Sequence, residues 1–408
     1  MNTTLACVMG GLSIIRALGR ADIPVACVLT PDAHERHALS RYVRKKLIAP
    51  GSMKNPGALL THLLRFGASL PRPPILFFDN DDDLLFVSRH RERLSAGFRF
   101  ALPSPELVED LVDKKRFAKL AARANLPTPE THVIAQGTAT HDDRMRKWTR
   151  FPCIVKPALR THWFGSRLGD HVIGSTQKAV AVSSRAELAA LAPALEAHPS
   201  DFILQPLIEG SEQRIVSYHA YVNQSGVIAE FTGRKVRTVP REYGFSSYVQ
   251  ITDDDRVRRL GRDIISRLGF QGVVKFDFKE DVRDGELYLL EGNPRFNLWH
   301  HPGAVAGVNL PALVYHDLVS PGTVRPVPRR VRAGVRWMWA LADLQECRAA
   351  GELHTLQWLR ELAAADVVED MCLSDPLPGV ARLVDRLLER VAPSGSRKEA
   401  PALGDVEA

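Results

Sequence analysis

A single stretch, residues 272–301, constrains the fold more than any other part of the sequence. Its first arm alternates between charged and apolar residues, which predicts a β-strand with one buried, apolar face. Asp284-Gly285 is typical of a turn, and a second strand is expected after it. One acid lies inside each arm, Asp277 in the first and Glu291 in the second, although strand interiors disfavour acids. We therefore expect a β-hairpin whose inner end carries chemistry.

Two carboxylates that face each other across a hairpin repel unless a cation lies between them. Mg²⁺ is bound in this way, through one or two carboxylates together with substrate phosphates. Asn293 adds a neutral oxygen ligand, and Arg295 adds a planar cation that suits phosphate. The alternative, a solvated hairpin with ordinary surface charges, is disfavoured by the complete motif Glu291-Gly292-Asn293-Pro294-Arg295.

The register of this hairpin stays open at the level of sequence. A strict two-residue turn would pair residue 283 with 286 and would set Asp277 opposite Gly292. Facing acids therefore require a bulge or a longer loop. Alternation along the second arm predicts a common side for four residues, which are Leu287, Leu289, Glu291 and Asn293.

A lysine within an apolar strand is a second constraint. Lys156 lies in the apolar run 151–157, where an unpaired ammonium group would be costly. A phosphate partner would remove that cost, whereas a lysine that snorkels to the surface is the alternative. The following segment, 158–178, is polar and punctuated by glycines, which favours a backbone that can fold over phosphates.

The chain begins with a strand, helix and strand pattern over residues 4–29. Gly10-Gly11 lacks the spacing of a dinucleotide fingerprint, so a close turn between strand and helix is the favoured interpretation. Further on, a buried strand enters the acidic run 79–83. This run lacks the glycine and the terminal glutamate of a calcium loop, and it is typical of a helix N-terminus.

Length and composition set the class of protein. A chain of 408 residues could hold two or three domains. The net charge of +7 comes from scattered basic residues, which favours anionic ligands over nucleic acid. The five cysteines lack metal-type spacing, which favours buried thiols in a reducing compartment. With no signal-peptide pattern and no long apolar stretch, we expect a cytoplasmic enzyme that is not in a membrane.

Taken together, these motifs resemble the signature of the ATP-grasp superfamily, in which an acid on one strand and Glu-x-Asn-Pro-Arg on the next hold the magnesium of MgATP. The longer form, with FDFK before the turn and NPRFNLWHHPG after it, is similar to the predicted carboxylate-amine ligases of that superfamily. The resemblance implies an α/β and α+β chain with four parts. These are a Rossmann-like pre-ATP-grasp domain (1–106), a two-lobed ATP-grasp domain (107–320), a small C-terminal extension (321–391) and a disordered tail (392–408).

The resemblance also implies roles for individual residues. Metal ligands would be Asp277, Glu291 and Asn293. Nucleotide contacts would come from Lys114, Lys156 and Lys178 at the phosphates, Gln205 and Leu207 at adenine, and Glu212 at ribose. Arg295 and Lys156 would be catalytic. Related ligases also place an acid near Asp81 in the cleft, and they place basic residues like Arg234, Lys235 and Arg237 there, although a solvated basic strand is an equal alternative.

The implied activity is an ATP-dependent ligase with Mg²⁺, or Mn²⁺ as an alternative metal. It would join a small carboxylate to an amine through an acylphosphate. The alternatives are another ATP-grasp reaction, such as carboxylation or phosphoryl transfer, and a non-catalytic nucleotide-binding module.

Overall fold

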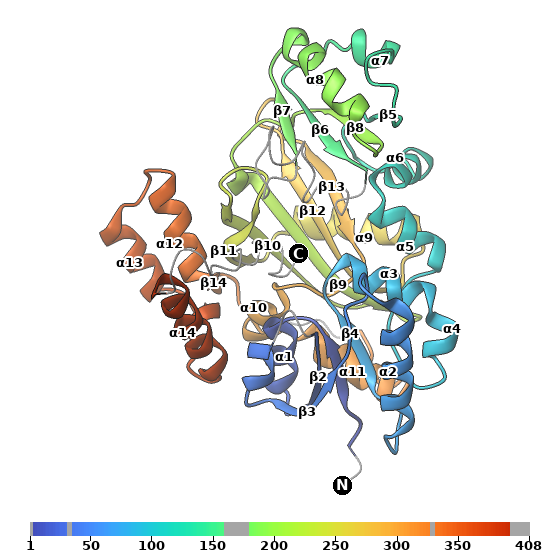
Figure 1. Ribbon diagram of the computed structural model, residues 1–408, viewed down its shortest axis with the longest axis vertical. Helices are drawn as coiled ribbons and strands as arrows, with labels where there is room; N and C mark the ends of the chain where they lie inside the picture. The colour runs from blue at the N-terminus through green and yellow to red at the C-terminus, as the bar shows by residue number, and fades with distance from the viewer. Residues whose placement is uncertain (1–2, 31–34, 159–178, 327–330, 392–408) are drawn as a thin grey trace.

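The computed structural model describes residues 3–30, 35–158, 179–326 and 331–391, which are organised by three β-sheets (Figure 1). Most of the glycine-punctuated segment, 159–178, and the tail 392–408 lie outside the described residues. Within the described part of the chain, no helix is both long enough and apolar enough to cross a bilayer.

The first sheet is parallel, with the strand order β3-β2-β1-β4. Every residue of β1, β2 and β4 is buried, as expected for a parallel sheet whose faces are covered by helices. The Rossmann-like beginning is therefore confirmed. Its elements are β1 (Ala6–Met9), α1 (Leu12–Gly19), β2 (Val25–Leu29), η1 (Glu35–Leu39), β3 (Val43–Ile48), α2 (Pro56–Ala68) and β4 (Ile75–Phe78).

The acidic run after β4 begins helix α3 (Asp81–Arg89), as predicted. The side chain of Asn80 accepts a hydrogen bond from the backbone N–H of Asp83 at 2.8 Å, which caps the helix. The three aspartates of the first turn stabilise the positive end of the helix dipole. The helices that follow are α4 (Arg91–Leu94), α5 (Pro105–Val112) and α6 (Lys114–Arg123).

A small antiparallel sheet with the order β5-β8-β6-β7 comes next, at the top of Figure 1. Alternation along β6 places Cys153 and Val155 in a core with helix α8, so Lys156 lies on the opposite face. The elements of this part are β5 (His132–Ile134), α7 (Asp143–Arg146), β6 (Cys153–Pro157), β7 (Val180–Val182), α8 (Arg185–Ala197) and β8 (Phe202–Pro206).

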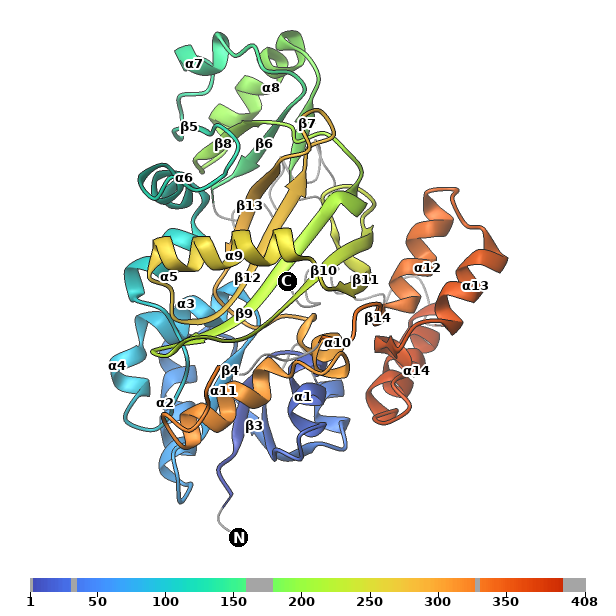
Figure 2. The ribbon, with the colours of Figure 1, turned by 180° about the vertical axis from the view of Figure 1, so that it is seen from behind.

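The largest sheet has seven strands in the order β13-β12-β9-β10-β11-β14-β15. Helix α9 lies across one face, as Figure 2 shows, and there Tyr218 and Phe276 enter a common core. Gly261 of α9 allows this approach, because a Cβ at that position would overlap the Tyr218 ring. The elements are η4 (Glu212–Arg214), β9 (Ile215–Asn223), β10 (Gly226–Val239), β11 (Phe245–Thr252), α9 (Asp255–Leu268), β12 (Gly272–Glu280), β13 (Leu287–Asn293), α10 (His300–Val305) and α11 (Leu310–Val319).

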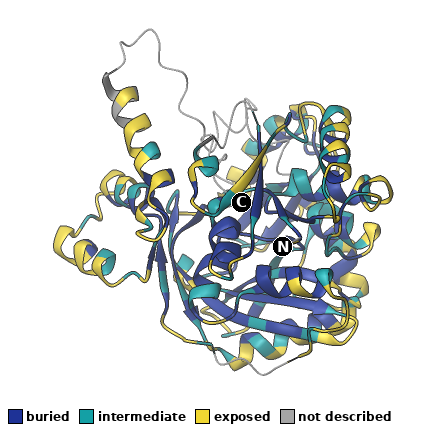
Figure 3. Ribbon diagram, turned by 90° about the horizontal axis from the view of Figure 1, so that it is seen from below, coloured by how far each residue is buried: buried dark blue, intermediate teal, exposed yellow. Residues whose placement is uncertain are grey.

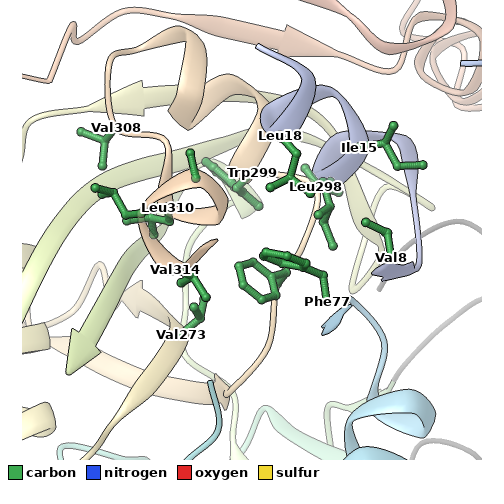
Figure 4. Packing of buried hydrophobic residues seen from close by; sticks show 14 of the residues in the cluster. Val8, Ile15, Leu18, Phe77, Val273, Leu298, Trp299, Val308, Leu310 and Val314 are labelled. Carbon is green, nitrogen blue, oxygen red and sulfur yellow. The ribbon is translucent and has the colours of Figure 1, made fainter. Parts of the chain in front are cut away.

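The other face of the large sheet shares a core with the N-terminal sheet. Figure 4 shows Leu18 and Phe77 of the N-terminal part near Trp299 and Val314. Because this core is continuous, the two sheets hold a fixed relationship across the interface. Figure 3 shows the strands of this region as buried and the outer faces of the helices as exposed.

The C-terminal part continues the large sheet. Strand β14 pairs with β11, and β15 pairs in parallel with β14. The elements are β14 (Arg336–Met338), α12 (Ala340–Ala349), α13 (Thr355–Ala363), β15 (Val367–Val368), η5 (Glu369–Met371) and α14 (Leu377–Val391). The domain limits expected at residues 106, 320 and 391 stay predictions.

Candidate active site

The β12-β13 hairpin brings its two acids directly opposite each other. Asp277 is paired with Glu291, and the pairing then shifts by one residue, so that Phe278 lies opposite Leu289. The loop 281–286 is also longer than a two-residue turn. Both a bulge and a longer loop are therefore present, and they resolve the register that the sequence left open.

The same bulge corrects the predicted side of the second arm. Leu287 and Leu289 pack in the core beneath α9, together with Phe276. Glu291 and Asn293 instead lie opposite Asp277 and Lys275. One extra residue in a strand reverses the face of all residues beyond it, so the four side chains expected on one side are divided between the core and the site.

Four neighbouring strands present their side chains in rows on this face of the sheet. The row at the acids runs Glu291, Asp277, Ser217 and Gly233, and the next row runs Asn293, Lys275, His219 and Phe231. Asp277 is only 2% exposed, and the Ser217 hydroxyl donates a hydrogen bond to its Oδ1 atom. The sheet therefore holds a buried carboxylate in a fixed position.

Lysines surround the acids of the site. Lys275 Nζ lies 2.8 Å from Asp277 Oδ2, and Lys235 Nζ lies 3.7 Å from the same oxygen. Burial alone would lower the pKa of Lys235, but Asp277, Glu212 and Glu291 together raise it above its usual value. Lys279 Nζ lies 3.6 Å from Glu212 Oε1. The sequence interpretation assigned no role to Lys275 or Lys279, although the alternation of β12 already placed both on the face of Asp277.

Lys156 faces this group from the small sheet. Burial, followed by repulsion from Lys114, lowers the pKa of Lys156 to about 8, and Glu291 and Glu212 act in the opposite direction. The backbone N–H of Lys114 donates to the carbonyl of Ala158 at 3.0 Å, which joins the start of α6 to the end of β6. The structure therefore brings Lys114, Lys156, Glu212 and Glu291 together. Lys178 lies outside the described residues.

Arg295 connects the hairpin to the N-terminal sheet. Its Nε atom donates to Asp81 Oδ1 at 2.6 Å, and one terminal nitrogen donates to the Asp79 carbonyl at 2.6 Å. A third contact, at 3.5 Å, reaches the side-chain oxygen of Asn293. The guanidinium group is therefore held in place beside the predicted metal ligands, with Asp81 as its partner.

Gly10 and Gly11 lie against Asp79, which precedes the helix that holds Asp81. The N–H of Gly11 donates to Asp79 Oδ2 at 2.6 Å, and a Cβ at Gly10 would overlap that carboxylate. Burial raises the pKa of Asp79 to about 7, which the Gly11 hydrogen bond opposes. The glycine pair is thus a close turn against Asp79.

Of three basic residues expected in the cleft, Lys235 alone contacts the acids described above. The Nε atom of Arg234 donates a hydrogen bond to Gln250 Oε1 at 2.9 Å. Arg237 forms hydrogen bonds to Asp343 and Glu361 of the C-terminal part. The expectation of a cleft contact for Arg237 is wrong, because shifts of register in β10 separate it from Lys235 and its charge is used by helices α12 and α13.

Comparison with solved structures identifies this architecture. The fold resembles an L-amino acid ligase from Bacillus licheniformis with a TM-score of 0.59 and 17% identity, over 80% of this chain and 78% of that one. A biotin carboxylase–β,γ-ATP complex from Campylobacter jejuni has a TM-score of 0.59 and 12% identity, over 82% of this chain and 74% of that one. Residues 225–340 match the family model described as ATP-grasp in the biosynthetic pathway with Ter operon. The chain has the ATP-grasp fold.

One sequence relative is itself named as a ligase. The D-aspartate ligase of Enterococcus faecium is 24% identical over 282 residues, which are 67% of this chain and 66% of the relative. The match therefore spans slightly less than two thirds of that relative's length.

The predicted adenine contacts of the ATP-grasp site lie where β8 ends. The side chain of Gln205 donates to the Thr131 hydroxyl at 2.8 Å. The N–H of Leu207 donates to the Pro152 carbonyl at 2.9 Å, and its carbonyl accepts from Arg283 at 3.2 Å. A hollow here is lined by residues that include Lys114, Lys156, Gln205 and Leu290. Base recognition through Leu207 itself would have to replace existing hydrogen bonds, and both adenine contacts stay predictions.

The predicted metal ligands of the ATP-grasp site fit Mg²⁺ by their chemistry. Asp277, Glu291 and Asn293 offer oxygen atoms from facing strands, and hard cations prefer such ligands. In the part of the chain that the structure describes, no cluster of three or more His, Cys, Asp or Glu side chains could hold a metal by itself. Two carboxylates and an amide suit a cation that is bound jointly with phosphate oxygens.

Proposed function

We propose that the protein is an ATP- and Mg²⁺-dependent carboxylate-amine ligase that forms an amide bond through an acylphosphate. The observation that carries this proposal is the register of the hairpin, in which the buried Asp277 lies opposite Glu291. Lys156 of β6 interacts electrostatically with Glu291 and Glu212, and Lys114, at the start of α6, lies close to Lys156. An arrangement of acids on one side and lysines on the other suits a metal and a chain of phosphates between them.

In this proposal, the protein side chains position and neutralise charge. Lys114 and Lys156 offset the charge of the nucleotide phosphates, and Glu212 accepts a ribose hydroxyl. Asp277, Glu291 and Asn293 would hold Mg²⁺, which would offset the negative charge of the phosphates. Arg295, which Asp81 and the Asp79 carbonyl hold, presents its planar cation to the acylphosphate. Preorganised charges of this kind suit phosphoryl transfer, which needs little covalent chemistry from the protein.

The relatives favour ligation of an amino acid. The D-aspartate ligase and the L-amino acid ligase are both named for joining amino acids. We therefore propose a small carboxylate and an amine, at least one of them an amino acid, as the substrates. Four of the five cysteines are buried free thiols, which supports the proposal of a cytoplasmic protein.

The proposal is tested by ADP release with mixtures of amino acids, small carboxylates and amines, followed by mass spectrometry of the products. An amide product that requires both ATP and Mg²⁺ is expected. Glu291→Gln keeps the shape of the side chain but removes its charge, and it should lower ADP release by about 100-fold or more. Glu92→Gln, which changes an exposed acid of α4, is the matched control. Full turnover by Glu291→Gln would contradict the metal assignment.

A second candidate is carboxylation, because the biotin carboxylase from Campylobacter jejuni has a similar fold. ADP release that depends on bicarbonate and needs no amine would favour it over ligation. Binding of ATP in calorimetry without turnover on the whole panel would instead favour a nucleotide-binding module.

A further inference from the structure

A cluster of buried polar side chains lies next to the row of residues that contains Asp277 and Glu291. His219 and His300 are fully buried and Asn297 is 4% exposed. Both ring nitrogens of each histidine and the amide nitrogen of Asn297 have no hydrogen-bond partner among the described residues. Buried polar groups are nearly always paired, so five unpaired nitrogens in one neighbourhood require an explanation.

Packing holds these side chains in place. The His219 ring stacks on Phe231 with centroids 4.4 Å apart, and its centroid lies 5.2 Å from that of Trp299. His300 meets His219 edge to face at 6.1 Å. Gly233 makes room for Trp299, because a Cβ there would overlap the indole ring. Aromatic contacts thus orient the rings while their nitrogens stay available.

Asn297 lies in the loop that leads into α10, which begins at His300. The N–H of His300 donates to the Asn297 carbonyl at 3.2 Å, and the Asn297 side-chain oxygen accepts from the Trp299 N–H at 3.1 Å. This second bond fixes which end of the amide is used by the protein. The NH₂ end is the end that remains, and it can only donate.

The charge of the group comes from Lys275. Lys275 lies directly opposite His219 across β9 and β12. Burial lowers the pKa of His300 to about 3 and that of His219 well below its usual value, and Lys275 contributes to both shifts. The imidazoles are therefore neutral near pH 7, and each has one N–H donor. Donors around one lysine suit an anion and repel an ammonium group.

Lys275 also connects this group to the acid row. Its ammonium lies 2.8 Å from Asp277 Oδ2, and its side chain is 12% exposed, so it forms the accessible edge of the group. A cation bound at Asp277 would compete for that carboxylate and would leave Lys275 to pair with another anion.

We propose that Lys275, Asn297 and the imidazoles of His219 and His300 form the subsite for the substrate carboxylate. This inference rests on the proposed ligase function, because it identifies where the group to be phosphorylated binds. The subsite lies one row from Asp277 and Glu291, so a carboxylate held by Lys275 is adjacent to the proposed phosphate end of the nucleotide. Phe231 and Trp299 form the apolar wall beside it.

The kinetic test compares Lys275→Met and Asn297→Leu with the control Lys119→Met, on the exposed side of α6. Each subsite variant should raise KM for the carboxylate by about 10-fold or more, as expected for a lost charged or buried hydrogen bond. The KM values for MgATP and for the amine should stay within about two-fold. An unchanged carboxylate KM, or a larger effect on the amine, would overturn the assignment. Variants whose only change is a lower thermal stability would also overturn the assignment.

A binding test does not depend on turnover. Protein labelled with ¹⁵N-histidine would be titrated with acetate, in the presence of Mg²⁺ and a non-hydrolysable ATP analogue, with methylamine as the counter-probe. His219→Gln and His300→Gln assign the two ring signals. Acetate should move both signals in the wild type but not in Lys275→Met, and methylamine should move neither. Histidine signals that do not shift with acetate, or that shift with methylamine, would overturn the subsite.

The two tests separate the subsite from the function on which it rests. If the wild type releases no ADP with any mixture, the ligase proposal fails, and the histidine signals still report whether a carboxylate binds. If the wild type is active while Lys275→Met keeps its carboxylate KM, the subsite alone is wrong.

Discussion

Arg295 and Asp81 are 214 residues apart in the sequence, yet their side chains meet at 2.6 Å. Arg295 is 4% exposed, so its charge depends on this partner and on the Asp79 carbonyl. The contact joins the first helix after the parallel sheet to the loop that follows the proposed metal ligands. It makes the N-terminal sheet part of the site.

Asp81→Asn should weaken both stability and activity. The buried guanidinium would lose its charged partner, which we expect to cost about 1–3 kcal/mol, reduced from the cost in a fully buried pair because Asp81 is partly exposed. Urea unfolding and ADP release measure the two effects. Glu92→Gln, which changes an exposed acid of α4, is the control. Equal behaviour of the two variants would show that Asp81 does not hold Arg295.

Gly10→Ala should destabilise the N-terminal sheet. The added methyl group would overlap the Asp79 carboxylate, which the Gly11 N–H also holds, and overpacking of this kind costs about 1–3 kcal/mol. Gly97→Ala is the matched control, since the nearest atom to its Cβ would be 3.8 Å away. Thermal unfolding should separate the two variants by several degrees, and coincident curves would contradict the close contact.

Lys156→Met should stabilise the ligand-free protein while weakening ATP binding. The pKa of Lys156 is lowered from 10.5 to about 8 in the folded protein, so burial of its charge opposes folding. Between about pH 8 and 10.5 the unfolded chain binds more protons, so this group's contribution to stability rises with pH in that window. Below about pH 8, Lys156→Met should be more stable than the wild type by up to about 3 kcal/mol.

Urea unfolding at a series of pH values, with and without MgATP, tests this prediction. Lys119→Met on the exposed side of α6 is the control. A Lys156→Met variant that is less stable than the wild type at neutral pH would contradict the cost of the buried charge. A variant that binds ATP normally would contradict the proposed phosphate contact.

Arg237→Met should loosen the C-terminal helices. Arg237 bonds to Asp343, which is 1% exposed and also accepts from the Trp358 indole at 2.8 Å. Removal of Arg237 would leave the buried Asp343 carboxylate without its cationic partner, at a cost of about 3–5 kcal/mol. Tryptophan fluorescence and limited proteolysis of residues 340–391 measure the effect, with Arg234→Met as the control. Unchanged proteolysis would mean that other contacts hold these helices.

The local features of the site follow from the sequence. The alternation of β12 placed Asp277 on one face and Phe276 in the core, and the acidic run of residues 79–83 indicated a helix N-terminus. The apolar run around Lys156 indicated a charge that needed a partner. Each of these predictions depends on the side-chain periodicity or on the desolvation of one residue, and both are properties of a short segment.

Tertiary structure decided which of these residues meet. The hairpin register depends on a bulge at which two residues oppose one, and that choice is made by the core beneath α9, where Leu289 is buried. The partners of Arg295 and Arg237 come from segments more than 100 residues away, and a charge alone does not specify its partner. The sequence by itself therefore determined the kinds of groups in the site. Long-range packing determined their pairing, because burial makes each unpaired charge costly and only the folded chain brings distant charges together.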